Sequence, residues 1–473
     1  MGVDRNLRFS NYRPNGYPRL KALSGLAFTA ILLSWTNPRL VGRVLSPQNY
    51  QPVLLIVACL VFSAGCEKSP PPNFRLNAVE WVKQEQMHLA SDQHFDEGYK
   101  TQIGSILTTL FGTPDDPKFP YLIGDDDPAH EIISIENLRI AAGPVASDKR
   151  GAPAGLYREH CAHCHGITGG GAGPTAALLN PYPRDFRLGK FKFKATPLRQ
   201  APTDHDMQRI LENGIPGTAM PSFRTLPDEH IQSLIQYVKY LSIRGQFERF
   251  LMGELAGLDG EPFVDLELIS QSPDGVEPSE DDIEEFEDQM YMLIGDELQE
   301  RTIARWLEPE KKITNVSPAP PEFESSHPGH SKLIDEGRSL FFGKGNCMQC
   351  HGDTGAGDGQ LSNFDDWTND WKNSANVDPS DPESYRIFTE VGALPPRPVR
   401  PRNLNVPGYR GGDRPTDLFL RIANGIEGTP MPASTALSTD EVWALVAYVK
   451  SLPFADTGVR SNGMPINDKQ VQR

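Results

Sequence analysis

Two short cysteine motifs carry the most specific chemistry in this sequence of 473 residues. Both have the spacing C-x-x-C-H, and they read Cys161-Ala-His-Cys164-His165 and Cys347-Met-Gln-Cys350-His351. This spacing is the pattern of covalent haem attachment. Two thiols so placed reach the two vinyl groups on one edge of a porphyrin, and the histidine that follows sets its imidazole under the iron. The sequence therefore predicts two covalent haem c groups.

Other uses of paired cysteines fit this pattern less well. A redox C-x-x-C of the thioredoxin kind needs neither a following histidine nor a second copy. A zinc ribbon could use four cysteines, but these two pairs lie far apart and each has its own histidine. The chain has only six cysteines, so no disulfide framework is indicated.

Two methionines are the predicted sixth ligands of the irons. Met220 and Met431 each lie in a Gly-Thr-x-Met-Pro segment. Most methionines serve as packing residues, but these two lie in Gly/Pro-rich loops ahead of a helix rather than on a helix face. A loop held by the following proline can place a thioether over the far side of a haem. Methionine ligation raises the reduction potential of a haem.

The motifs belong to a repeat that covers residues 146–245 and 331–455. Residues 206–241 align with residues 417–452 without a gap, and duplication of one structural unit explains this. Each copy ends in a predicted helix with an apolar stripe. The stripes consist of Ile231, Leu234, Ile235, Val238 and Leu241, and of Val442, Leu445, Val446, Val449 and Leu452.

Several basic residues and histidines are weaker candidates. Haem propionates need cationic or amide donors, for which the candidates are Arg184, Arg187, Lys192, Arg400, Arg402 and Arg410. A solvated basic surface explains any one of these as well. Alternative iron ligands are His205, His230, His327 and His330. The other histidines outside the two motifs have no matched pattern.

Each copy resembles a class I cytochrome c domain, with an N-terminal helix, C-x-x-C-H-G, a Met-Pro loop and a C-terminal helix. The resemblance covers about half of the chain and implies a mainly α fold, in which two tandem domains are joined by an acidic, partly helical linker. It implies that Cys161, Cys164, His165 and Met220 serve one haem, and that Cys347, Cys350, His351 and Met431 serve the other. It also implies that the carbonyl of Pro174 accepts the N–H of His165; the aligned residue in the second copy is Gln360.

Charge separates the N-terminus from the rest of the chain. Residues 1–65 carry a net charge of +6, and since the whole chain carries −16, residues 66–473 carry −22. So acidic a body argues against nucleic-acid partners. Two short apolar runs lie in the basic region, and the second ends in Ser63-Ala-Gly-Cys66. This is typical of a bacterial lipoprotein signal, so Cys66 is the predicted lipidation site; a cleaved signal or an uncleaved anchor are the alternatives.

The remaining segments are less informative. Residues 66–145 show no site chemistry and are either a docking arm or a cover for the first haem unit. The acidic linker 246–330 contains one predicted amphipathic helix, which Ser279 and Asp282 would cap. A polar insertion at about 362–384 and a tail from residue 456 complete the chain.

Electron transfer outside the cytoplasmic membrane is the function these features favour. The resemblance implies redox partner proteins of a respiratory chain, and a membrane contact through the N-terminus. The alternative is a dihaem peroxidase, an enzyme in which one haem can open to substrate. The repeated Met-Pro loops argue against it, because two closed iron sites leave no place for peroxide. A haem sensor is a third, weaker hypothesis, since no output motif accompanies the haem motifs.

Overall fold

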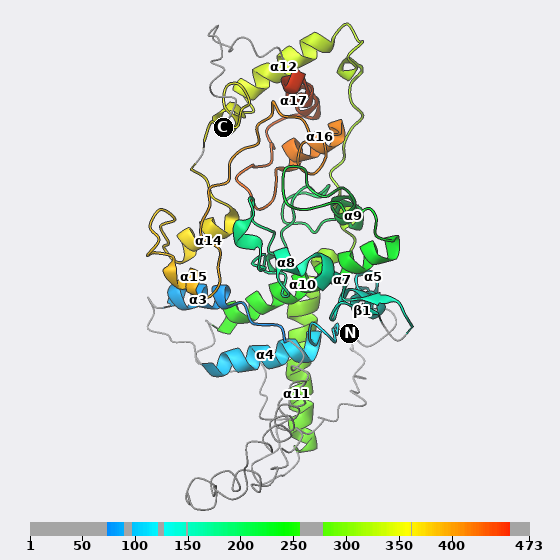
Figure 1. Cartoon of the computed structure of the whole chain (residues 1–473), viewed down its shortest axis with the longest axis vertical. Helices are drawn as coiled ribbons and strands as arrows, with labels where there is room; N and C mark the ends of the chain where they lie inside the picture. The colour runs from blue at the N-terminus through cyan, green and yellow to red at the C-terminus, as the bar shows by residue number, and fades with distance from the viewer. Residues whose placement is uncertain are drawn as a thin grey trace, which may run out of the picture. The chain divides into compact units, whose positions relative to one another are not determined.

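The computed structural model describes residues 73–88, 97–121, 127–147, 150–255, 278–360 and 362–454. The predicted signal region, Cys66 and the tail from residue 456 lie outside these residues. Within them the chain is mainly α-helical (Figure 1), as the sequence predicts. The strands of this part are the two-residue β1 (Ala146–Ser147) and β2 (Pro153–Ala154), which pair antiparallel. No helix that the structure describes has the length and apolar character needed to cross a membrane.

A group of helices ahead of the first motif covers the first repeat. These are α3 (Ala78–His88), α4 (Glu97–Phe111), α5 (Ala129–Ile132) and α6 (Ile135–Ala141). Helices α3, α4 and α6 contact the long helix α10 (Asp228–Leu255). Of the two roles expected for this segment, the structure shows the cover.

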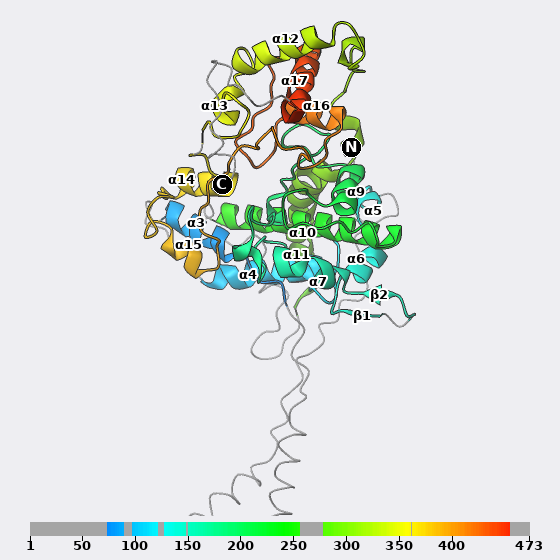
Figure 2. The ribbon, with the colours of Figure 1, turned by 45° about the horizontal axis from the view of Figure 1, so that its top comes forward.

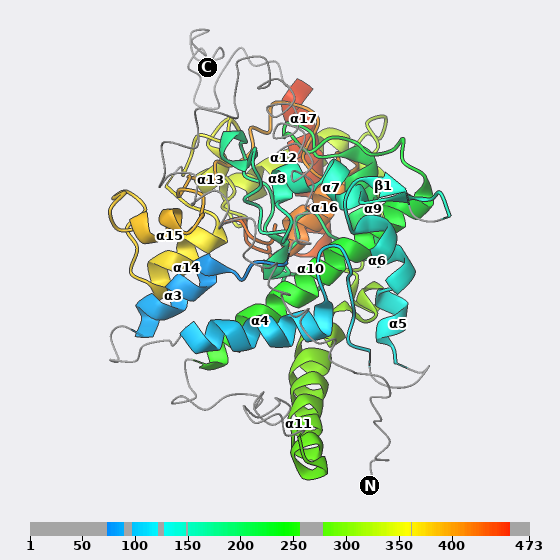
Figure 3. The ribbon, with the colours of Figure 1, turned by 60° about the horizontal axis from the view of Figure 1, so that its bottom comes forward.

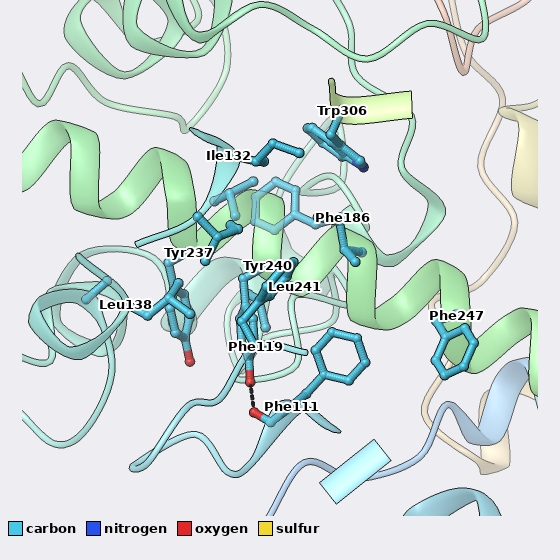
Figure 4. Close-up of a cluster of buried hydrophobic side chains, with 14 of the residues drawn as sticks. Phe111, Phe119, Ile132, Leu138, Phe186, Tyr237, Tyr240, Leu241, Phe247 and Trp306 are labelled. Atoms are coloured by element: carbon cyan, nitrogen blue, oxygen red, sulfur yellow. Dashed lines mark hydrogen bonds between the residues drawn. The ribbon is translucent and has the colours of Figure 1, made fainter. Parts of the chain in front are cut away.

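Helix α10 is the centre of the larger hydrophobic core. The five residues of its predicted stripe are at most 8% exposed. The helix continues past residue 245 to Leu255, and Phe247 and Leu251 in this extension are fully buried. Figure 4 shows Tyr240 of α10 donating its hydroxyl hydrogen bond to the carbonyl of Phe111. Buried tyrosines need such a partner, so this bond fixes α4 against α10.

The first repeat consists of short elements packed on α10. They are α7 (Leu156–His160), α8 (Ala162–His165), the 3₁₀ turns η3 (Ala176–Leu178) and η4 (Phe186–Leu188), and α9 (Asp204–Asn213). Thr203 and Asp206 form a capping box at the start of α9. Because the box satisfies two otherwise unbonded amides, it fixes where the loop from the haem motif ends.

The linker begins as the sequence predicts. Helix α11 (Glu280–Met292) is capped by Ser279 and Asp282, and it continues as a π-helical segment η6 (Leu293–Thr302). Met290 and Leu293 are buried against the first repeat, whereas Ile283 is 40% exposed. The predicted amphipathic helix therefore packs through its C-terminal end. Three short turns lead on to the second repeat: η7 (Ile303–Trp306), η8 (Pro309–Lys312) and η9 (Pro321–Phe323).

The second repeat has its own core and carries the insertion. Its elements are α12 (His330–Phe342), α13 (Met348–His351), α14 (Asp366–Ser374), α15 (Arg386–Glu390), α16 (Pro415–Asn424), α17 (Thr439–Ser451) and η10 (Leu452–Phe454). Helices α12 and α17 pack together over this core (Figure 2). The inserted helices α14 and α15 lie beside α3 (Figure 3), where Lys83 pairs with Asp370 at 2.9 Å. The N-terminal segment thus contacts both repeats.

Candidate haem sites

The first cysteine motif forms a tight turn between α7 and α8. The amide of His165 donates to the carbonyl of Cys161 at 2.9 Å, and the amide of Cys164 donates to the same oxygen at 3.1 Å. Both cysteines are free thiols, and burial raises the pKa of Cys161 to about 12. The turn therefore presents two unbonded thiols and an imidazole from five consecutive residues, as covalent haem attachment requires.

His165 is held in one orientation by the backbone. Its Nδ1 lies 3.0 Å from the carbonyl oxygen of Arg184, and its ring stacks on Phe186 at 4.4 Å. Burial lowers the pKa of His165 to about 4, so the ring is neutral. A neutral ring that donates from Nδ1 leaves Nε2 free to bind iron. The expectation that Pro174 supplies this carbonyl is wrong, because Arg184 has taken the place.

The second site repeats this arrangement. His351 Nδ1 lies 3.0 Å from the carbonyl oxygen of Arg402, and burial again lowers the histidine pKa. Cys347 and Cys350 are free thiols in the same turn. The question that Gln360 left open is therefore answered by Arg402, which lies 51 residues after the histidine.

The two carbonyl donors belong to a matched segment that the gap-free alignment misses. Pro183-Arg-Asp-Phe186 corresponds to Pro401-Arg-Asn-Leu404. Phe186 donates its amide to Gly169, and Leu404 donates to Gly355, so both segments are tied to the loop after their motif in the same way. The signal was a Pro-Arg pair in each copy. The insertion hid it, since it lengthens the second copy between motif and pair.

The methionine loops also have matching geometry. The Thr218 hydroxyl donates to Ile215 O at 2.8 Å and accepts from the Met220 amide at 3.1 Å. Thr429 makes the same two bonds in the Met431 loop. Each loop starts at a glycine with positive φ, 64° at Gly214 and 71° at Gly425. A Cβ at either would lie within 2.8 Å of the methionine carbonyl, so only glycine fits.

Both methionines are partly buried, and their role as iron ligands stays a prediction. The repeated threonine bonds nevertheless show that sequence similarity in these loops has become the same backbone conformation in both copies. A thioether is a weak ligand that the protein must position, so a rigid loop is what methionine ligation requires.

Three arginines hold buried nitrogen atoms that lack a hydrogen-bond acceptor. These atoms are Arg184 Nη1, Arg402 Nε and Arg410 Nε. Burial, and next the charge of Arg402, lower the pKa of Arg410, so two guanidinium groups lie near each other. Buried donors of this kind need an anion, and haem propionates fit them. Arg187 instead pairs with Asp185, and Arg400 is exposed.

The alternative histidine ligands have other partners or positions. His330 Nδ1 lies 3.0 Å from Glu322 O, and His327 Nδ1 accepts from the Gly329 amide. His205 is exposed. Across the described ranges, no group of three or more His, Cys, Asp or Glu side chains could hold a further metal ion.

Comparison with known proteins agrees with this geometry. The model of the family described as cytochrome c oxidase, cbb3-type, subunit III matches residues 149–238 and 332–449. No curated protein matches the sequence. A solved structure of the reducing HAO-like protein complex Kustc0457/Kustc0458 from Kuenenia stuttgartiensis matches with 26% identity and a TM-score of 0.40, over 65% of this chain and 98% of that one. The family match identifies cytochrome c domains in this chain, and such domains bind haem c covalently.

Proposed function

We propose that this protein is a dihaem electron carrier that works outside the cytoplasmic membrane. The observation that carries the proposal is the duplication of a whole site. Each copy holds two free thiols, a histidine oriented by an Arg carbonyl, and a threonine-braced methionine loop. A single copy would serve one haem. Two copies with the same backbone bonds support two haems with the same ligand set.

The residues assigned to each haem have distinct tasks. The thiols of Cys161 and Cys164 would hold the first haem, and those of Cys347 and Cys350 the second. His165 and His351 would bind the irons from Nε2. When bound, haem c supplies a reversible one-electron couple of its iron.

The protein's own contribution is to keep the site closed and tuned. Met220 and Met431 would fill the sixth positions and so exclude exogenous ligands, while the arginines with unbonded buried nitrogens would neutralise propionates. Such an arrangement favours transfer of electrons over chemistry on a bound substrate.

Location and partners follow from the same chemistry. Covalent haem attachment takes place after export, and cytochrome c domains of the matched family are typically extracytoplasmic. We propose that acylation of Cys66 attaches the protein to a membrane, and that its partners are redox proteins of a respiratory chain. The −22 net charge of residues 66–473 would attract a partner with a basic contact surface.

The test is the optical spectrum of the purified ferric protein together with its haem content per chain. We expect two haems and a far-red sulfur-to-iron band with the strength of two methionine ligands. A single haem per chain would overturn the dihaem assignment. Two haems with a half-strength band and a high-spin signature would instead support an openable iron, as in a peroxidase.

A further inference from the structure

The first repeat contacts the second at the segment that leads into Met431. Residues 193–199, which precede α9, lie against Asn424 and Glu427. Asn424 ends α16, and Glu427 lies four residues before Met431 within the methionine loop. The contact is therefore made with the backbone that positions a predicted iron ligand.

Asn424 is bound on both sides of its amide group. Its Nδ2 donates to Ala195 O at 3.2 Å and to Thr196 O at 3.4 Å. Its Oδ1 accepts from the Thr314 hydroxyl at 2.7 Å. Asn424 is only 7% exposed, so these bonds cannot be exchanged for water without opening the interface.

A buried ion pair joins the methionine loop itself to the first repeat. Lys194 Nζ lies 2.8 Å from Glu427 Oε2, and their side chains are 4% and 8% exposed. Glu427 Oε1 also accepts from the Arg199 amide at 3.2 Å. Lys194 donates in addition to the carbonyls of Pro197 and Gln200. Each charge is thus paired and hydrogen-bonded, as burial requires.

The methionine loop of the first repeat lacks an equivalent. Pro216 stands where the second copy has Glu427, so no carboxylate is available there. Asn213, the counterpart of Asn424, is exposed and bonds to Arg224 within its own repeat. From the second repeat, Arg410 reaches Gly217 O at a long 3.4 Å. The interface is therefore asymmetric with respect to the two methionines.

We propose that residues 193–199 of the first repeat form a clamp that holds the Met431 loop closed over the second haem. Lys194 is its main positioning residue, and it acts through Glu427 rather than by touching iron or haem. The Met220 loop holds itself closed. This inference rests on the proposed function, since it assumes methionine ligation. It makes the second haem the one whose sixth ligand depends on how the two domains are joined.

The first test is the substitution Lys194→Met in the full-length haem-loaded protein. It leaves Glu427 as a buried carboxylate without its cation, which should drive the loop toward solvent. We expect the far-red band to fall toward half of its wild-type strength. We also expect imidazole to bind one haem about tenfold more tightly, because the apparent affinity rises with the population of the open state. In a Met220→His background the remaining band belongs to Met431, and its loss there assigns the effect.

A double variant separates the charge from general damage. Lys194→Met combined with Glu427→Met loses the same lysine hydrogen bonds but leaves no buried charge, and apolar replacement of a buried pair is often neutral. We expect it to restore most of the band. Lys311→Met removes one partner of an exposed ion pair with Glu308 and should change neither the band nor imidazole binding. Glu427→Gln, which leaves Lys194 unpaired, should reproduce the effect if Lys194→Met fails to fold.

The outcomes distinguish this inference from the function on which it rests. If the wild-type spectrum lacks two methionine bands, the proposed function itself fails. If the wild type has both bands, and the Lys194→Met and Glu427→Gln variants keep both and bind imidazole like the wild type, the clamp is refuted alone. A loss confined to Met220 would refute it as well. Equal loss in the single and double variants would show that Lys194 only stabilises the fold.

Discussion

Each proximal histidine receives its orientation from a backbone oxygen, so no particular side chain is required at that place. The acceptors are the carbonyls of Arg184 and Arg402, both 3.0 Å from the imidazole Nδ1. Hydrogen bonding at this nitrogen fixes the tautomer and makes the other nitrogen a better ligand. Because the two bonds are alike, differences between the haems should come from the methionine side and from the surroundings.

The spacing of cysteines and histidines could be predicted from the sequence, because covalent attachment fixes it within five residues. The acceptor for His165 could not. A carbonyl is offered by every residue, so only the folded loop decides which one arrives. The insertion then places 51 residues between His351 and Arg402, which conceals the equivalence of the two sites.

Met220→His should change the first haem and spare the second. Replacing a thioether by a second imidazole lowers the reduction potential, by on the order of a hundred millivolts within the roughly 0.8 V range that axial ligands span. Redox titration followed in the visible spectrum measures both potentials. Met431→His is the matched variant and should shift the other couple. Equal shifts of both couples in either variant would contradict independent sites.

Helix packing depends on close backbone approaches that apolar periodicity does not reveal. The stripe of α17 was predictable from its spacing, and its five residues are at most 7% exposed. The partner of this stripe was not, since the crossing of α12 and α17 depends on Gly337. A Cβ at Gly337 would lie 1.9 Å from the carbonyl oxygen of Ala444. The extension of α10 beyond residue 245 was also missed, because helices α3 and η6, distant in sequence, cover it.

Gly337→Ala should destabilise the second repeat despite the better helix propensity of alanine. The clash is with backbone, which cannot turn aside, so we expect the free energy of unfolding to fall by about 3 kcal/mol. Gly104→Ala in α4 is the matched control, because no atom lies within 4 Å of its Cβ position. That variant should gain about 0.5–1 kcal/mol. Denaturant unfolding measures both, and similar values for the two glycines would refute the close crossing.

At the scale of the whole molecule, charged side chains link the two repeats in addition to their separate cores. Arg209 of α9 donates to Asp417 of α16 at 2.6 Å and to Gly411 O at 2.9 Å. Asp417 also forms the capping box of α16 and accepts from Arg414. One buried carboxylate thus fixes a helix start and a domain contact together. The sequence showed Asp206 and Asp417 as repeat equivalents, but not that Arg209 crosses to the second copy.

Asp417 should make the joint between the repeats sensitive to acid. Burial alone would raise its pKa, but the hydrogen bond from Arg414 and the charges of Arg209, Arg414 and Arg421 outweigh burial and hold it below the ordinary 3.8. A lowered pKa means that the carboxylate stabilises the fold above this ordinary value. That contribution is lost as the pH falls from 3.8 through the folded pKa.

Asp417→Asn should therefore lower the free energy of unfolding by about 2 kcal/mol at pH 7, the usual size for hydrogen bonds to a charged group. The difference between wild type and variant should stay constant from pH 7 to about pH 5 and close below about pH 4. Urea unfolding at a series of pH values measures it. Asp440→Asn, at an exposed position in the first turn of α17, should run parallel to the wild type. If the Asp417→Asn curve ran parallel too, the carboxylate would not be the acid-sensitive joint, and the contact between the repeats would depend on the neutral hydrogen bonds around Asn424 instead.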